Sequence, residues 1–130
     1  LETNVKENNS SVKPVMADAL EICETFADGE LDLIVSNPPY IKSADIETLQ
    51  KEVRLEPRLA LDGGEDGCDF YREIVSRWSR KLKKGGALAF ELGENQADAV
   101  KALMTDKGFS DFKISLDFGG VQRAIIGTLL

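Results

Sequence analysis

The stretch Leu31-Asp32-Leu33-Ile34-Val35-Ser36-Asn37-Pro38-Pro39-Tyr40 joins a short apolar run to a stiff tetrapeptide with a polar tip. Leu33, Ile34 and Val35 form a continuous apolar run of the kind found in strands that are covered on both faces. In open α/β sheets, ligands bind beyond the carboxyl ends of such strands. The sequence therefore predicts an α/β fold in which the tetrapeptide lies at a ligand site.

The tetrapeptide offers hydrogen-bond acceptors that hold one direction. Its two consecutive prolines hold φ near about −65°, remove two backbone donors and push Asn37 out of the helical region. An NH2 group can then donate to the Asn37 side-chain oxygen and the Pro38 carbonyl while Tyr40 packs on its planar face. This arrangement favours methylation of a nitrogen. The tetrapeptide alone fits a strand-ending turn equally well, because Asn and Pro are common turn residues.

Composition limits the class of protein. The chain has 130 residues, 42% of them hydrophobic and 30% charged, which is typical of one globular domain. It contains no histidine, so a Ser-His or Cys-His nucleophile and a His-ligated metal site are excluded. Cys23 and Cys68 are isolated, which predicts reduced thiols and no metal site. Without a secretory signal or an apolar membrane span, the chain is expected to be cytoplasmic.

Charge argues against a nucleic-acid-binding surface. The net charge is −7, the opposite of what neutralises phosphates. One basic cluster is nevertheless present, at Arg77, Arg80, Lys81, Lys83 and Lys84. We expect this cluster to be the solvated end of a helix, with a local nucleic-acid patch as the alternative.

Strand-like and helix-like patterns alternate along the chain without an internal repeat, as in layered α/β domains. The predicted elements are, in order, a polar helix end within residues 1–11, a strand from Val12 to Met16, a helix from about Asp69 to Lys84 stopped by Gly85-Gly86, a strand from Ala87 to Leu92, a helix from Gln96 to Lys107 stopped by Gly108, and an antiparallel hairpin from Phe112 to Leu130. The Gly63-Gly64-Glu65-Asp66-Gly67 segment is expected to be a loop and not a phosphate cradle, because no strand and helix flank it.

Further segments accompany the tetrapeptide: Val53-Arg54-Leu55-Glu56-Pro57, Ala60-Leu61-Asp62-Gly63-Gly64-Glu65-Asp66-Gly67 and Tyr71-Arg72. Together with Asn37-Pro38-Pro39-Tyr40-Ile41, they resemble the HemK/PrmC family of release-factor glutamine methyltransferases, over nearly the whole chain. The resemblance implies a partial class I S-adenosylmethionine-dependent methyltransferase fold, with a Rossmann-like sheet that ends in the hairpin. The family's first two strands, with their glycine-rich cofactor loop and ribose-binding carboxylate, have no counterpart here. Residues 1–130 therefore resemble the C-terminal part of one catalytic domain, without the family's helical N-terminal domain.

The resemblance also implies a reaction and its residues. A methyl group would pass from S-adenosylmethionine to the side-chain amide nitrogen of the Gln in the Gly-Gly-Gln motif of a peptide-chain release factor. Asn37, Pro38 and Tyr40 would be catalytic, and Pro39 would join them in binding the substrate.

The same resemblance implies that Asp18, Ala19 and Asn37 contact the cofactor, with the Asp18 carboxylate near the adenine. Asp18 has an equally good alternative role as the cap of a helix from Ala19 to Phe26. Because half of the cofactor site has no counterpart, we expect this chain alone to bind S-adenosylmethionine weakly or not at all and to be inactive.

Two other functions stay open: methylation of an exocyclic amine in DNA or RNA, with a flipped-out base stacked on Tyr40, and a non-catalytic interaction domain. Arg54 and Glu56 are expected to pair with each other, with the positioning of a substrate loop as the alternative. Glu91 and Glu94 are expected to be solvated loop carboxylates, although they could face the crevice. Since the missing strands would leave backbone edges and apolar side chains open, we expect a rearranged sheet or, in preference, a dimer.

Overall fold

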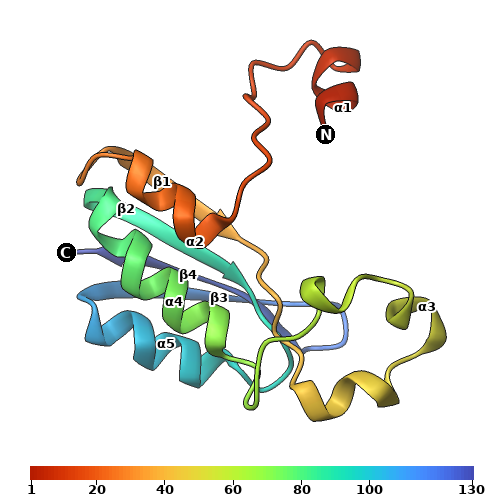
Figure 1. The fold of residues 1–130 in the computed structure, drawn as a ribbon. Helices are drawn as coiled ribbons and strands as arrows, with labels where there is room; N and C mark the ends of the chain where they lie inside the picture. The colour runs from red at the N-terminus through yellow and green to blue at the C-terminus, as the bar shows by residue number, and fades with distance from the viewer.

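The computed structural model describes residues 1–130 and has a four-stranded mixed sheet at its centre (Figure 1). In spatial order, the strands are β1 (Leu31–Ser36), β2 (Leu82–Glu91), β4 (Gln122–Leu129) and β3 (Phe109–Leu116). β1 and β2 are parallel, whereas β4 is antiparallel to both of its neighbours. The α/β class and the C-terminal antiparallel hairpin are therefore as predicted.

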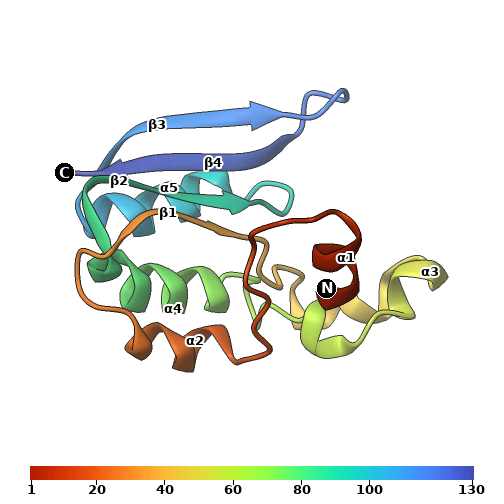
Figure 2. The same ribbon diagram turned by 90° about the horizontal axis from the view of Figure 1, so that it is seen from above.

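Helices cover only one face of this sheet. α2 (Ala19–Ile22), α4 (Asp69–Trp78) and α5 (Ala97–Asp106) lie on the same side of the strands (Figure 2). On this face, Leu88, Phe90 and Ile125 are at most 1% exposed. On the other face, Leu33 and Val35 of β1 are 54% and 71% exposed. The prediction that β1 is covered on both faces is wrong for this chain, because no element of it packs on that second face.

The two long helices supply the rest of the core through the predicted helical spacing. Ile74 and Val75 of α4 and Val100 and Met104 of α5 are at most 4% exposed and belong to one cluster with the sheet residues. Trp78 packs at the edge of this cluster, as expected of a core residue. α5 ends before Gly108, which has a φ of 90° and marks the predicted stop.

The first long helix is shorter than predicted. α4 ends at Trp78, a 3₁₀ helix follows at Ser79–Lys81, and β2 already begins at Leu82, where the prediction continued the helix to Lys84. Leu82 pairs with Leu31 of β1, so the residues from Leu82 onwards belong to a strand. Their positive charges had favoured the C-terminal end of a helix instead. Strand pairing between distant segments thus outweighed the local helix preference of residues 82–84.

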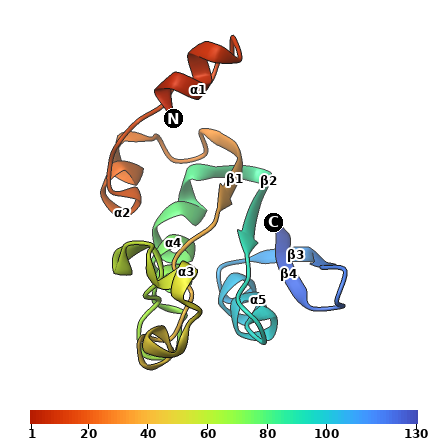
Figure 3. The ribbon, with the colours of Figure 1, turned by 90° about the vertical axis from the view of Figure 1, so that its right-hand side faces the viewer.

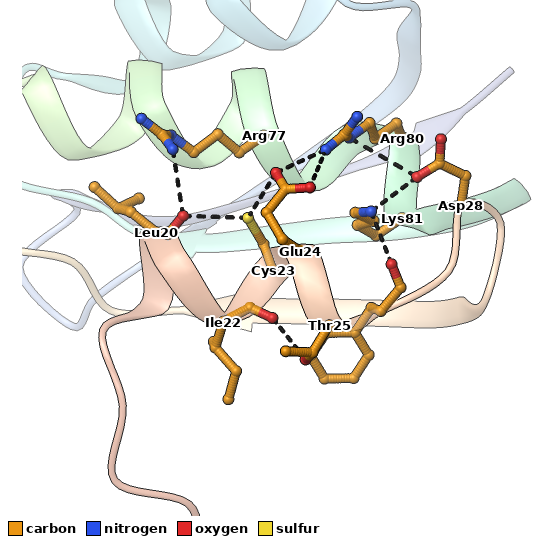
Figure 4. A network of polar contacts seen from close by, with 10 residues as sticks. Leu20, Ile22, Cys23, Glu24, Thr25, Asp28, Arg77, Arg80 and Lys81 are labelled. Atoms are coloured by element: carbon orange, nitrogen blue, oxygen red, sulfur yellow. Dashed lines mark hydrogen bonds and ion pairs between the residues drawn. The ribbon is translucent and has the colours of Figure 1, made fainter.

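Four of the five residues of the basic cluster, all but Lys84, pair with acidic groups, so the expectation of a solvated helix end is only partly correct. Arg80 donates to both carboxylate oxygens of Glu24, at 2.6 and 2.7 Å. Lys81 is 4% exposed and donates to the Phe26 carbonyl at 2.7 Å and to Asp28 at 2.9 Å (Figure 4). The remaining pairs are Arg80 with Asp28, Arg77 with Glu73 and Lys83 with Asp32. The contacts of Arg80 and Lys81 attach the segment that follows α2 to the 3₁₀ helix that precedes β2.

The N-terminal segment differs from its prediction. α1 (Glu2–Glu7) is the expected short polar helix and lies apart from the sheet (Figure 3). The predicted strand from Val12 to Met16 is wrong, since these residues form no strand and Val15 and Met16 are 64% and 102% exposed. A strand needs a neighbour for its backbone groups, and β1 pairs with β2 alone. The expected rearrangement of the sheet is also not found.

Residues 37–68 leave the carboxyl end of β1 and return to α4 through short elements (Figure 1). These are 3₁₀ helices at Ser43–Thr48 and Arg58–Ala60, and α3 (Lys51–Arg54) between them. The segment from Gly63 to Gly67 is a loop, as predicted. No helix anywhere in the chain has the length and apolar character needed to cross a membrane.

Candidate active site

A cleft of about 400 Å³ opens at the carboxyl end of β1. Asn37, Pro38 and Tyr40 line it, together with the carboxylate residues Glu56 and Glu91. β1 and β2 are parallel, so the residues that follow β1 and those that end β2 meet at one edge of the sheet. The structure thus brings together the three residues that the sequence predicts as catalytic.

The acceptors of the tetrapeptide are free. Asn37 is exposed, and neither its side chain nor its carbonyl takes part in a hydrogen bond within the chain. The carbonyl of Pro38, which is a buried residue, also accepts none. A bound NH2 group could therefore use these oxygens without displacing a protein donor. This geometry is compatible with the acceptor clamp, whose residue roles stay a prediction.

Tyr40 is held by a carboxylate of the neighbouring strand. Its hydroxyl donates to Glu91 Oε1 at 2.9 Å. Burial, followed by this hydrogen bond, raises the pKa of Tyr40 above its usual value, so the phenol stays protonated at neutral pH. Glu91 is therefore not the solvated loop carboxylate that we expected. Its place at the end of β2 was the available signal, because parallel strands end at the same edge.

The loop after Ala60 holds the tetrapeptide from the other side. Ile41 donates its amide to the Leu61 carbonyl at 3.0 Å and accepts from the Gly63 amide at 2.8 Å. A Cβ at Gly63 would lie 2.8 Å from Tyr40 Cα, so only glycine permits this approach. The segment from Ala60 to Gly67, which is part of the family resemblance, thus supports the backbone next to the tetrapeptide.

Two carboxylates stabilise that loop. Hydrogen bonds from the Ser43 hydroxyl, at 2.5 Å, and the Gly64 amide, at 3.0 Å, lower the pKa of Asp62. The Arg72 guanidinium and the Cys68 amide hold the pKa of Asp66 at about 2. Both groups are charged and occupied by neighbours, so they serve loop geometry and not proton transfer.

Asp18 and Ala19 do not line the cleft. Asp18 is the N-cap of α2 and accepts from the Leu20 amide at 2.7 Å, which is the alternative role given above. The Ala19 carbonyl accepts from the Trp78 indole at 2.9 Å. Cofactor contacts by these two residues stay a prediction.

The expected ion pair between Arg54 and Glu56 is not present. Arg54 is the last residue of α3, and Glu56 lines the cleft. Every ion pair in the structure is made by other residues. Glu94 lines a neighbouring cavity instead of the cleft.

Comparison with known proteins relates this chain to a group of methyltransferases. No protein-family model matches the chain. A release factor glutamine methyltransferase of Geobacter sulfurreducens is 50% identical over 107 residues, covering 82% of this chain and 38% of that protein. One of Clostridium acetobutylicum is 38% identical over 127 residues, covering 97% and 42%. The chain spans about two fifths of the length of these curated relatives.

Solved structures agree on the fold. A release-factor-specific protein-(glutamine-N5) methyltransferase of Alicyclobacillus acidocaldarius aligns with a TM-score of 0.51 at 28% identity, covering 85% of this chain and 54% of that one. A methyltransferase of Pyrococcus furiosus gives 0.61 at 20% identity, covering 98% and 54%. A Thermus thermophilus protein described as a DNA modification methylase, in complex with S-adenosyl-L-methionine, gives 0.57 at 16%, covering 86% and 51%. The expected partial class I methyltransferase fold is confirmed.

Proposed function

This chain is a sequence relative of the release factor glutamine methyltransferases, and we propose that in its full-length form the protein methylates a release factor. The methyl donor is S-adenosylmethionine, and the acceptor is the side-chain amide nitrogen of the Gln in a Gly-Gly-Gln motif. The observation that carries the proposal is the cleft at the end of β1, where the acceptors of Asn37 and Pro38 are free. Residues 1–130 then form the C-terminal part of the catalytic domain.

An amide nitrogen is a poor nucleophile, so positioning is the main contribution of this chain. Asn37 Oδ1 and the Pro38 carbonyl accept the two amide hydrogens, which holds the NH2 group in one orientation. When bound, S-adenosylmethionine supplies an activated methyl group on a sulfonium. The clamp aims the nitrogen at this methyl group, and no covalent enzyme intermediate is needed. The transfer would leave S-adenosylhomocysteine, and the proton that the amide nitrogen loses would pass to water at the exposed Asn37 end of the cleft.

Tyr40 acts as a planar wall of the cleft. The substrate amide packs on its ring while the hydroxyl is engaged by Glu91 at 2.9 Å. Since the phenol is protonated at neutral pH, it donates to this carboxylate and is not available as a base. The ring plane is thereby fixed before the substrate arrives.

The charge of the cleft supports a protein substrate over a nucleic acid. Glu56 and Glu91 line it, and no lysine or arginine does. A neutral side-chain amide can enter next to these carboxylates, whereas the phosphates that flank a flipped base would be repelled. Methylation of an exocyclic base amine is the second candidate and is disfavoured for this reason. A non-catalytic role is disfavoured by the free acceptors.

The cofactor fits this chain only in part. Asn37 lies at the cleft, but Asp18 and Ala19 lie at the start of α2, outside it. The remaining cofactor contacts would come from residues beyond this chain, so the isolated chain is proposed to be inactive. A release-factor substrate also implies a cytoplasmic protein.

We also propose that the isolated chain dimerises. The outer edge of β1 has no strand partner, and Leu33 and Val35 are exposed beside it. An open edge next to apolar side chains is a template for pairing with a second copy.

The deciding experiment incubates the full-length protein with methyl-labelled S-adenosylmethionine and one of three acceptors. These are a release factor, the same factor with its Gly-Gly-Gln glutamine changed to alanine, and single-stranded DNA or RNA. Label only on the unaltered release factor supports the proposal. Label on nucleic acid, or on the altered factor to the same extent, contradicts it.

A further inference from the structure

Gln96 is a buried polar residue between β2 and α5 that the reaction described above does not use. It stands at the N-cap position of α5, yet its side chain makes no capping bond and turns inward, with 9% of the residue exposed. Burial of an amide is costly unless its polar atoms are all paired. The partners of this amide therefore indicate what the residue is for.

The side-chain nitrogen of Gln96 forms a donor arm. Nε2 donates to the Tyr40 carbonyl at 2.9 Å and to the Gly67 carbonyl at 3.3 Å. One donor thus reaches the tetrapeptide of the cleft, and the other reaches the glycine-rich loop that supports it. The donor arm ties both segments to the end of the sheet.

The side-chain oxygen forms an acceptor arm. Oε1 accepts from the Gly93 amide at 3.0 Å and from the Tyr71 hydroxyl at 3.2 Å. The Tyr71 hydroxyl also lies 2.9 Å from the Glu91 carbonyl. The single hydroxyl proton of Tyr71 is shared between this carbonyl and Gln96 Oε1, so the Gln96 amide makes three full hydrogen bonds and one shared one. An amide is the side-chain group that offers two donors and two acceptors together.

These contacts hold Tyr40 at both ends. Its carbonyl is bonded to Gln96, while its hydroxyl is bonded to Glu91. Pro38 and Pro39 precede it, so a rigid segment transmits the position of Tyr40 to the Pro38 carbonyl and Asn37. A Cβ at Gly93 would lie 2.5 Å from Gln96 Oε1 and 2.9 Å from Tyr40 Cδ2, which shows how closely the three residues meet.

We propose that Gln96 is a positioning residue of the acceptor clamp: its donor arm sets the orientation in which Asn37, Pro38 and Tyr40 receive the substrate amide. The proposal rests on the proposed function for its catalytic consequence. Its structural half, that Gln96 fixes Tyr40, stands independently. Acting through Tyr40, Gln96 touches neither the substrate nor the methyl group.

The variant Gln96→Glu separates the two arms, because it keeps the shape and the acceptor positions but loses both N–H donors. In the full-length enzyme we expect kcat to fall about 10- to 100-fold, the size of effect that small misplacement of reacting groups causes. KM for S-adenosylmethionine should change far less. Gln96→Met removes both arms without adding charge, and it should show the same loss of kcat.

Tyr71→Phe is the matched control. It removes a hydrogen bond to the same Gln96 oxygen but leaves the donor arm to Tyr40 intact. We expect it to lower thermal stability while kcat stays near the wild-type value. If Gln96→Glu and Gln96→Met retain wild-type kcat, or if all three variants lose kcat in proportion to their loss of stability, the positioning role is overturned.

A second readout needs no methyl transfer. The full-length protein is labelled with 3-fluorotyrosine, and the fluorine resonance of Tyr40 is identified as the one that is absent from Tyr40→Phe. In Gln96→Glu or Gln96→Met, the Tyr40 resonance should shift or broaden. An unchanged resonance contradicts the inference even in an active enzyme. A changed resonance in an enzyme that methylates no release factor supports the inference and rejects the proposed function.

Discussion

The Tyr40 hydroxyl lies 2.9 Å from Glu91 Oε1, and the two residues are 51 positions apart in the chain. Tyr40 follows β1, and Glu91 is the last residue of the parallel strand β2. The bond fixes the ring of Tyr40 across the edge of the sheet where the cleft opens. The orientation of Tyr40, a candidate catalytic residue, therefore depends on the pairing of β1 with β2.

This relationship sets the first prediction. Tyr40→Ala in the full-length enzyme should raise the Michaelis constant for the release factor and lower kcat, because the wall of the cleft is lost. Tyr40→Phe keeps the ring and loses one hydrogen bond, worth about 1 kcal/mol, so its effect should be several-fold smaller. Steady-state kinetics of both variants test this. Equal damage from the two substitutions would assign the role to the hydroxyl.

Asn37→Ala should nearly abolish turnover. Loss of one fixed hydrogen-bonding group at a reacting centre costs about 2 to 4 kcal/mol, which corresponds to a decrease in kcat of about 30- to 1,000-fold. Asn8→Ala, on the exposed end of α1, is the control and should leave kcat unchanged. Near-normal turnover of Asn37→Ala would contradict the proposed role of Asn37 in the acceptor clamp.

Lys81→Ala should destabilise the fold more than Lys83→Ala. Lys81 is buried, and its removal leaves the Phe26 carbonyl without its donor, a loss of about 1 to 3 kcal/mol in the free energy of unfolding. Lys83 and Asp32 form an exposed pair, whose loss should cost at most about 1 kcal/mol. Urea unfolding of the two variants compares these costs, and equal values would contradict the burial argument.

Acid should destabilise the chain through Asp62, Asp66 and Asp117. Hydrogen bonds lower the folded-state pKa of all three, by the Ser43 hydroxyl, the Arg72 guanidinium and the Val121 amide, respectively. Their stabilisation is complete above the unfolded pKa of about 3.9 and is lost as pH falls through each lowered folded-state pKa, which for Asp66 is about 2. The free energy of unfolding, measured from pH 5 downwards, should therefore decrease, and less steeply in Asp66→Asn. An identical slope in that variant would exclude a contribution from Asp66.

The isolated chain should be a dimer that binds S-adenosylmethionine weakly or not at all. Val35→Lys introduces a charge beside the open edge of β1 and should shift the chain to a monomer in light scattering, because a buried unpaired charge is costly. Val12→Lys, in the exposed N-terminal segment, should leave the dimer intact. A monodisperse wild-type monomer that binds the cofactor at micromolar strength in calorimetry would overturn both parts of this prediction.

Patterns confined to neighbouring residues determined much of this structure. The apolar run before Asn37 predicted β1, the spacing of Val100 and Met104 predicted α5, and alternation around a Gly-Gly turn predicted the hairpin of β3 and β4. The two prolines of the tetrapeptide determined the free acceptors at the cleft. Each of these features depends on periodicity or on backbone restriction, and both are properties of short segments.

Tertiary structure decided the rest. Parallel pairing with β1 ended α4 at Trp78, and the lack of a neighbouring strand left Val12 to Met16 unpaired. Gln96 resembles a surface residue at a helix start, and its contact with Tyr40, 56 positions away, depends on which strands are adjacent. The physical reason is that burial and hydrogen bonding between distant segments outweigh the small local preferences of each residue.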